Sequence, residues 1–161
     1  MTRPFDCEIR PYRSCDASAT LAVFRDAVML TASKDYTPEQ IAAWAGQDNQ
    51  DLDTWDKARR ARSSFVACLN GEIIGFTDVD GDGYIEMLFV APRYGRQGVA
   101  TAMLDHVERI ARKSGAPTLS ANVSVTALRF FKHRGFIVQA VQHPTVGGVQ
   151  LTNHHMTKNL R

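Results

Sequence analysis

A loop containing glycine leads directly into the strongest predicted helix of this 161-residue chain. Residues 84–104 read YIEMLFVAPRYGRQGVATAML, which predicts an apolar strand, a loop and the start of a helix. The first turn of a helix has unpaired backbone N–H groups and a positive dipole end, which together bind phosphate. Gly98 and Ala100 add no bulk there, Arg96 adds a positive charge and Thr101 adds a hydroxyl. The spacing alone favours a plain tight turn, with an anion site as the alternative.

The usual nucleotide-binding motifs are absent from the sequence. There is no GxxxxGK[ST], which excludes a P-loop. No GxGxxG follows the first predicted strand, and the glycine loop lies past the middle of the chain, which disfavours a dinucleotide-binding Rossmann domain.

Two segments around this loop resemble the motifs of one known family. The first is Leu88-Phe89-Val90-Ala91-Pro92 followed by Gly95-Arg96-Gln97-Gly98-Val99-Ala100, and the second is ALRFFKHRGF at 127–136. They resemble the V-x-P, [QR]-x-x-G-x-[GA] and A-x-x-(F/L)-Y-x-x-x-G-F patterns of the GNAT N-acetyltransferase superfamily. The resemblance is specific over about residues 63–142 and extends to the whole chain by the order of its elements.

The resemblance implies acetyl-CoA as cosubstrate and assigns it a set of contacts. The pyrophosphate would bind at Arg96, Gln97, Gly98, Val99, Ala100 and Thr101. The amides of the pantetheine arm would pair with the backbone of Leu88, Phe89 and Val90. A backbone N–H in the same strand would polarise the thioester carbonyl, as an oxyanion donor does.

Two further pantetheine contacts depart from the family pattern. Ser124 occupies the position of an asparagine that often contacts the pantetheine, and Asn122, on the same face of that strand, is the substitute that we expect. Gly95 stands where glutamine or arginine is usual in the phosphate loop, which leaves Arg96 and Gln97 as the polar anchors.

Phe131 occupies the position of the family's tyrosine, which protonates the departing thiolate. A phenyl ring has no proton to donate, so we expect Phe131 to contact the cofactor only by packing. Either the thiolate leaves unassisted or another group protonates it. Tyr94, His133 and His154 are the alternatives, each with a structural or surface role as the simpler interpretation.

Glu86 is our candidate for the general base. An attacking amine must be neutral, so a base has to remove its proton directly or through water. Glu86 is the only charged residue in the apolar strand 84–91. Burial of an unpaired carboxylate would raise its pKa toward the range in which a general base works. The alternative is a structural glutamate paired with an arginine or lysine from a neighbouring element.

The N-terminal half and the last hairpin are expected to form the acceptor pocket, as they do in the family. Tyr36, Trp44 and Trp55 are the aromatic candidates for binding a flat or cationic acceptor, with a place in the core as the alternative. The basic segment KARRAR at 57–62 suits an acidic partner or a solvated helix end. His154 and His155 alternate across a strand and cannot bind one metal from one face, so we expect no metal site.

Composition bears on several other classes of protein. A net charge of +2 disfavours a small nucleic-acid-binding domain, which is the third alternative, and no apolar run is long enough to span a membrane. Three cysteines without CxxC spacing argue against a disulfide framework and a cysteine-built zinc site. With no signal core at the N-terminus, we expect a cytoplasmic protein. Separately, we expect the protein to be a monomer or a homodimer.

The elements that must position these residues follow from periodicity and turn signals. Strands are expected at 5–10, 64–69, 72–78, 84–91, 119–124, 136–142 and 149–156, and helices at 16–33, 37–46, near Trp55, 98–113 and 125–134. Asn70-Gly71 predicts a tight hairpin turn. We expect a single α/β domain of the α+β type over residues 1–161. The resemblance implies the GNAT fold, with a single mixed, mostly antiparallel sheet of about six to seven strands and about four flanking helices.

The sequence therefore predicts an acetyl-CoA-dependent N-acetyltransferase. It would transfer the acetyl group directly to a primary amine, of a small molecule or a peptide, in a ternary complex. The alternative is a noncatalytic module that binds or senses acyl-CoA, which the loss of the tyrosine at Phe131 makes plausible.

Overall fold

The computed structural model describes residues 7–46 and 51–161, and its first part is helical. The elements are β1 (Glu8–Pro11), α1 (Ala17–Asp26), α2 (Pro38–Gly46) and α3 (Leu52–Arg60). The helix expected over 16–33 is α-helical only in α1; a π-helical turn and a 3-10 turn continue it to Lys34. The helix expected over 37–46 is confirmed, and its start has the expected reciprocal cap. Gln40 N donates to Thr37 Oγ1 at 3.1 Å, and Thr37 N donates to Gln40 Oε1 at 2.9 Å.

The second part of the chain supplies most of the strands. These are β2 (Ser63–Leu69), β3 (Glu72–Val79), β4 (Tyr84–Ile85), β5 (Leu88–Val90), β6 (Thr118–Ser124), β7 (Ile137–Gln142), β8 (Thr145–Val146), β9 (Val149–Gln150) and β10 (Asn153–Asn159). Two helices lie among them, α4 (Val99–Lys113) and α5 (Leu128–His133). The hairpin between β2 and β3 turns at Asn70 and Gly71, whose positive φ values of 51° and 81° fit the expected turn.

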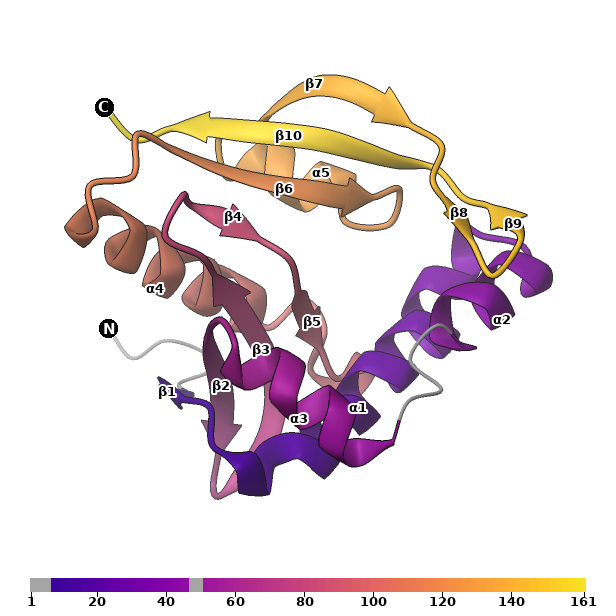
Figure 1. Ribbon diagram of the computed structural model, residues 1–161, viewed down its shortest axis with the longest axis horizontal. Coiled ribbons are helices and arrows are strands. Elements are labelled where there is room, and N and C mark those ends of the chain that lie inside the picture. Colours follow the sequence, from indigo (N-terminus) through magenta and orange to yellow (C-terminus); the bar gives the residue numbers. More distant parts are fainter. Residues whose placement is uncertain (1–6, 47–50) are drawn as a thin grey trace.

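The described strands form two four-stranded sheets and a two-stranded sheet of β8 and β9, where one sheet was expected (Figure 1). The orders are β1-β2-β3-β5 and β4-β6-β10-β7, and the pairings in both are antiparallel except for the parallel pair β4–β6. The single strand expected over 84–91 is wrong, because it is interrupted at Glu86 and Met87. Its first half belongs to one sheet and its second half to the other, so this segment connects the two sheets.

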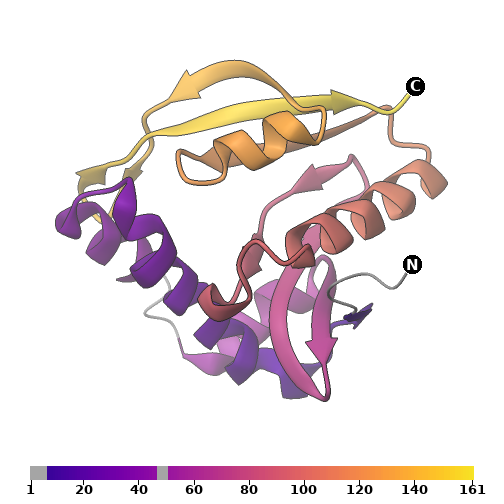
Figure 2. The ribbon, with the colours of Figure 1, turned by 180° about the vertical axis from the view of Figure 1, so that it is seen from behind.

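Helices α1 and α3 cover one face of the β1-β2-β3-β5 sheet and α4 packs on its other face through Val99 and Met103, whereas α5 packs on the β4-β6-β10-β7 sheet. In Figure 1, α1 and α3 lie in front of β2 and β3, and the reverse view of Figure 2 brings α4 and α5 to the front. One apolar cluster joins α4, α5 and the β6–β10 sheet around Leu104, Val107 and Met156, and another joins α1 to β2 and β3 around Phe24, Trp55 and Phe76. Among the helices that the structure describes, none covers the front face of the β4-β6-β10-β7 sheet (Figure 1).

Gly83 allows β4 to approach β6 closely. A Cβ atom at this position would lie 2.1 Å from the carbonyl oxygen of Thr118, and the φ of +86° also favours glycine. The carbonyl of Gly83 accepts a hydrogen bond from Ser120 N at 2.9 Å. The pairing at the start of β4 therefore depends on the absence of a side chain here.

Candidate active site

A gap opens where β5 and β6 diverge. The β4–β6 pairing consists of Tyr84 with Ser120 and Ile85 with Ala121, after which β5 pairs with β3 instead. Within the described residues, the edge of β5 opposite β3 has no strand partner, and residues 122–124 of β6 pair only with β10, so that their other edge is unpaired. Two strand edges with free backbone groups thus face one gap (Figure 1).

The register of β5 decides which of its backbone groups face that gap. Ala91 N donates to Ile74 O of β3 at 2.8 Å. Backbone groups alternate in direction along an antiparallel strand, so Phe89 also faces β3, and Leu88 and Val90 face away from it. The backbone N–H and C=O groups of Leu88 and Val90 are therefore directed toward the gap, whereas Phe89 contributes its side chain.

Asp78 of β3 supports the interruption between β4 and β5. Its Oδ1 accepts hydrogen bonds from Glu86 N at 2.8 Å and from Met87 N at 3.4 Å. These two N–H groups would otherwise lose their partners where the chain changes sheets. Asp78 is only 1% exposed, and this burial raises the pKa of its carboxyl group.

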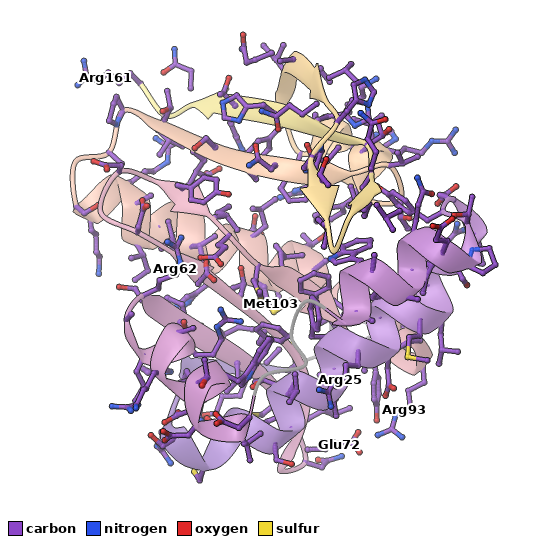
Figure 3. All side chains as sticks on the ribbon, turned by 45° about the vertical axis from the view of Figure 1, so that its right-hand side comes forward. Arg25, Arg62, Glu72, Arg93, Met103 and Arg161 are labelled. Carbon is purple, nitrogen blue, oxygen red and sulfur yellow. The ribbon has the colours of Figure 1, made fainter. Side chains whose placement is uncertain are left out.

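Arg62 connects Asp78 to the predicted base, Glu86. Its guanidinium lies 3.1 Å from Asp78 Oδ1, 3.4 Å from Glu86 Oε2 and 3.7 Å from Asp80 Oδ2. It also donates a 2.7 Å hydrogen bond to the carbonyl of Tyr84. In Figure 3, Arg62 lies below β4, at the side of the gap between the two sheets.

The expected burial of Glu86 is wrong. Its side chain is 43% exposed, and it has the arginine partner that we considered as the alternative. The physical reason is the interruption of the strand, which turns the residue out of the apolar sheet. Glu86 nevertheless lines the cavity that lies between the two sheets, so its carboxylate is accessible to a bound molecule.

The cavity occupies the gap and has a volume of about 370 Å³. Its lining comes from α1, α2, the β4–β5 segment, β6, α5 and the β8–β9 hairpin. The lining residues are Phe24, Tyr36, Trp44, Tyr84, Ile85, Glu86, Met87, Leu88, Phe89, Ala121, Asn122, Val123, Ser124, Ala127, Phe131, Pro144, Val146, Leu151, Thr152 and Asn153. Several members were not singled out from the sequence, notably Phe24, Met87 and Tyr84, because only the fold brings them together.

Tyr36 and Trp44 line the cavity, as their predicted acceptor-binding role requires. The hydroxyl of Tyr36 donates to Thr152 O at 2.6 Å and accepts from Val125 N at 2.9 Å, and burial raises its pKa. This side chain therefore also fixes the N-terminal helices to the C-terminal sheet. The half-buried ring of Trp44 lies 5.4 Å from that of Tyr36 and 6.4 Å from that of Phe89, measured between centroids.

The acceptor-binding role expected for Trp55 is not compatible with its position. Trp55 is 1% exposed, and it packs against Phe24 and Phe76 in the core. Its indole N–H donates to Thr20 Oγ1 at 2.9 Å. The apolar face of α3 is turned inward, which removes Trp55 from the cavity wall.

Asn122 and Ser124 line the cavity, and both have partners within the protein. Asn122 Nδ2 donates to the Tyr84 hydroxyl at 3.3 Å, and its Oδ1 lies 3.1 Å from His155 Nδ1. Ser124 Oγ accepts from Ala127 N at 3.1 Å, which leaves its own proton available to donate. Their contact with a pantetheine arm remains a prediction.

Phe131 also lines the cavity, whereas the three alternative acids do not. Phe131 is buried against Phe136, with ring centroids 5.0 Å apart. The hydroxyl of Tyr94 donates to Glu72 at 2.9 Å, and neither His133 nor His154 lines the cavity. Tyr84 is a cavity tyrosine that the sequence analysis did not consider, and burial raises the pKa of its hydroxyl.

The start of α4 has the features of an anion site. Gly98 has a φ of +90° and Arg96 a φ of +59°, so the loop turns sharply before the helix. No side chain caps this end, and the first helical hydrogen bond is from Ala102 N to Gly98 O at 3.0 Å. The N–H groups of Val99, Ala100 and Thr101 precede that bond and are free for a ligand. Figure 2 shows this loop at the end of α4 that lies below α5.

Two further properties concern the described residues alone. They contain no group of three or more histidine, cysteine, aspartate or glutamate side chains arranged to hold a metal ion. None of their helices is long and apolar enough to cross a membrane.

Comparisons with known proteins agree with this geometry. The model of the acetyltransferase (GNAT) domain matches residues 32–160. The chain is 35% identical over 149 residues to YafP of Escherichia coli (strain K12), named an uncharacterized N-acetyltransferase, with 92% of this chain and 93% of that protein covered. The crystal structure of a GCN5-related N-acetyltransferase from Rhodopseudomonas palustris is 31% identical, with a TM-score of 0.93 over 99% of this chain and 98% of that one.

More distant structures share the fold. PaiA N-acetyltransferase from Thermoplasma acidophilum, solved with coenzyme A, is 19% identical with a TM-score of 0.77, over 96% of this chain and 99% of that one. YncA from Salmonella typhimurium, solved with acetyl-CoA, is 21% identical with a TM-score of 0.71, over 98% of this chain and 95% of that one. The fold and the comparisons together define an enzyme of the acyltransferase class. The chain belongs to the GNAT acetyltransferase family.

Proposed function

We propose that this protein transfers the acetyl group of acetyl-CoA to a primary amine by direct attack in a ternary complex. The observation that carries the proposal is the divergence of β5 from β6. It opens a cavity beside a strand edge with free backbone groups, and residues 91–98 lead from that strand to an uncapped helix start. A long cofactor with amides and a pyrophosphate fits that combination.

The cofactor would bind along the gap. Its pyrophosphate would accept hydrogen bonds from the N–H groups at the start of α4, with Arg96 adding positive charge. The pantetheine amides would pair with the backbone of Leu88 and Val90. Coenzyme A and acetyl-CoA in the PaiA and YncA structures support a cofactor of this kind in the shared fold.

Transfer begins with removal of a proton from the acceptor's ammonium group. Glu86 lines the cavity and would take this proton, directly or through water. The amine nitrogen then attacks the thioester carbonyl, and a backbone N–H of β5 stabilises the oxyanion. Collapse of this intermediate breaks the C–S bond, and the positively charged nitrogen gives its remaining extra proton to water, which leaves a neutral amide. The released CoA thiolate takes a proton from water because Phe131 has none to give.

Replacement of Glu86 with glutamine tests the role of the base. We expect Glu86→Gln to lower kcat by about 100-fold or more with acetyl-CoA affinity unchanged, as loss of a general base does. Asp82→Asn, at an exposed carboxylate of the turn before β4, is the matched control and should retain full activity. An unchanged kcat in Glu86→Gln would exclude Glu86 as the base. Binding of acetyl-CoA without acetyl transfer to any amine would favour the noncatalytic module.

A further inference from the structure

The charged side chains of the cavity wall are limited to a single carboxylate. Of the twenty residues that line it, Glu86 is the one with a charged side chain, and the wall has no lysine, arginine or histidine. Arg62 reaches Glu86 from behind the wall, but it also pairs with Asp78 and Asp80. Three carboxylates therefore share the guanidinium of Arg62, and Arg59, which donates to Met87 Sδ from behind the wall, does not line the cavity either.

This distribution disfavours an acceptor with a carboxylate next to its amine. In an α-amino acid the two groups are attached to one carbon, so the carboxylate enters the cavity together with the reacting nitrogen. It would lose its hydration without gaining a cationic partner, and Glu86 would repel it. A second anionic group, such as a phosphinate, would add to this cost.

Aromatic side chains form a continuous part of the same wall. The ring of Phe89 lies 5.0 Å from that of Phe24 and 6.4 Å from that of Trp44, and Trp44 lies 5.4 Å from Tyr36, measured between centroids. Such a surface binds a flat or apolar body by burial and stacking, and its ring faces attract an ammonium group. Trp44 is only half-buried, so part of its surface is open to a ligand.

Polycations fit the wall less well than monoamines do. Each additional ammonium group of a polyamine or an aminoglycoside needs a carboxylate or an equivalent set of acceptors once it is desolvated. Glu86 is the single carboxylate on the wall, and it serves the reacting nitrogen. The other ammonium groups would have only neutral acceptors of the wall, such as the amide oxygen of Asn153.

We propose that the acceptor is a primary amine on an aromatic or apolar body, without an acidic group and without further charged amines. This inference rests on the proposed acetyl transfer and names the class of substrate for that same site. Amine and ring take different parts of the cavity: the amine lies beside Glu86, and the ring lies against Trp44 and Phe89.

Matched pairs of acceptors test the proposal. The probes are tryptamine with tryptophan, phenethylamine with phenylalanine, and spermidine, each assayed by acetyl-CoA-dependent release of the CoA thiol. Within a pair the body is identical and only the carboxylate differs. We expect kcat/KM for the amine to exceed that for the amino acid by about 100-fold or more, since the unpaired carboxylate is both desolvated and repelled.

Truncation of the aromatic wall tests the position of the ring. Trp44→Ala should raise KM for tryptamine about tenfold, the effect of losing one ring's contact, with acetyl-CoA affinity unchanged. Leu52→Ala removes a side chain that is 44% exposed outside the cavity and is the control. An unchanged KM in Trp44→Ala would overturn the placement of the ring.

The possible outcomes separate this inference from the proposed function. Faster acetylation of tryptophan, phenylalanine or spermidine than of the monoamines would overturn the inferred class while supporting amine acetylation. Binding of acetyl-CoA without acetylation of any amine would overturn the proposed function, and the inference with it.

Discussion

Asp78 contacts both the backbone at the strand interruption and the arginine that pairs with Glu86. Its carboxylate accepts hydrogen bonds from two backbone N–H groups, and it forms an ion pair with Arg62. Asp78→Asn keeps an oxygen for the backbone but removes the charge that pairs with Arg62. We expect kcat to fall about tenfold, because Arg62 and Glu86 lose their fixed arrangement, while stability changes by less than about 1 kcal/mol. Steady-state kinetics and chemical denaturation measure the two effects.

Asp78→Ala is the informative companion variant. It removes the acceptor itself and leaves the partly buried N–H of Glu86 without its partner, which should destabilise the fold by about 1–3 kcal/mol. Equal stability in both variants, or full activity in Asp78→Asn, would contradict the role that we assign to Asp78.

Glu86 could be found from the sequence because a single charge in an apolar strand is conspicuous. The exposure of the Glu86 side chain could not be predicted, since it depends on the interruption of the strand after Ile85. Asp78 lies in TDVDGDG, where aspartates resemble ordinary turn residues, so nothing local distinguishes the one that is buried. Trp44 lines the cavity and Trp55 lies in the core. This difference could not be predicted, because long-range packing decides which side of each helix is covered by the rest of the chain.

The interrupted strand is the element on which the site depends, and it was the main feature that periodicity missed. YIEMLFVA is apolar on both sides of the interruption, so its pattern does not reveal that the chain changes partners. The hairpin turn at Asn70-Gly71 and the capped start of α2 have local signatures, and both were predicted correctly.

The loop before α4 makes its contribution through backbone conformation. Gly98→Ala adds a Cβ at a φ of +90°, with no neighbouring atom within 4 Å, so the effect is strain of about 1–2 kcal/mol in the turn itself. We expect acetyl-CoA to bind about tenfold more weakly, because a relaxed turn redirects the N–H groups at the helix start. Titration calorimetry measures the change.

Gly71→Ala is the control for this experiment. Gly71 has a φ of +81°, also with no atom within 4 Å, but it lies in the β2–β3 hairpin. It should cost similar stability without changing acetyl-CoA affinity. Equal weakening in both variants would indicate a general effect of stability rather than a role of the loop.

The close approach of β4 to β6 gives a second prediction at this scale. Gly83→Ala would place a Cβ 2.1 Å from Thr118 O, and the strands must separate to relieve the clash. We expect a loss of about 3 kcal/mol of stability, seen as a lower Tm. Gly81→Ala, in the same turn with no atom within 4 Å, should leave Tm nearly unchanged. An unchanged Tm in Gly83→Ala would contradict the pairing described.

For the whole molecule, one buried ion pair sets part of the response to acid. Asp16 is 3% exposed, and it accepts hydrogen bonds from Arg10 at 2.8 and 2.9 Å and from Arg13 N at 2.8 Å. The bond from Arg10 lowers the pKa of Asp16 below its usual value. The resulting stability is present above the unfolded-state pKa of about 4 and is lost as the pH falls through the lower folded-state value.

Asp16→Asn should therefore lower Tm at neutral pH, and the difference from the parent protein should shrink below about pH 4. Asp53→Asn is the control, since Asp53 and its partner Lys57 are both well exposed and should contribute little. A difference in Tm that stayed constant down to low pH would contradict the charge-based explanation.

Fold class and element order could be predicted because the two motifs lie in separate elements, the β5–α4 segment and α5, at the spacing that the family resemblance implies. The separation of β4 and β5 into two different sheets could not be predicted, because it depends on which strand edges pair between distant parts of the sequence. The oligomeric state stays a prediction, with β7 as an outer strand of its sheet and exposed Ile137 and Val141 on it.

The central claim is that the divergence of β5 from β6 forms an acetyl-CoA site, and titration calorimetry of the purified protein with acetyl-CoA, CoA and ATP tests it most directly. We predict saturable binding of both CoA species and much weaker binding of ATP, because only the CoA species carry a pantetheine arm for the free edge of β5. Equal binding of ATP would reduce the site to a general anion site at α4. Absence of binding by either CoA species would contradict the account.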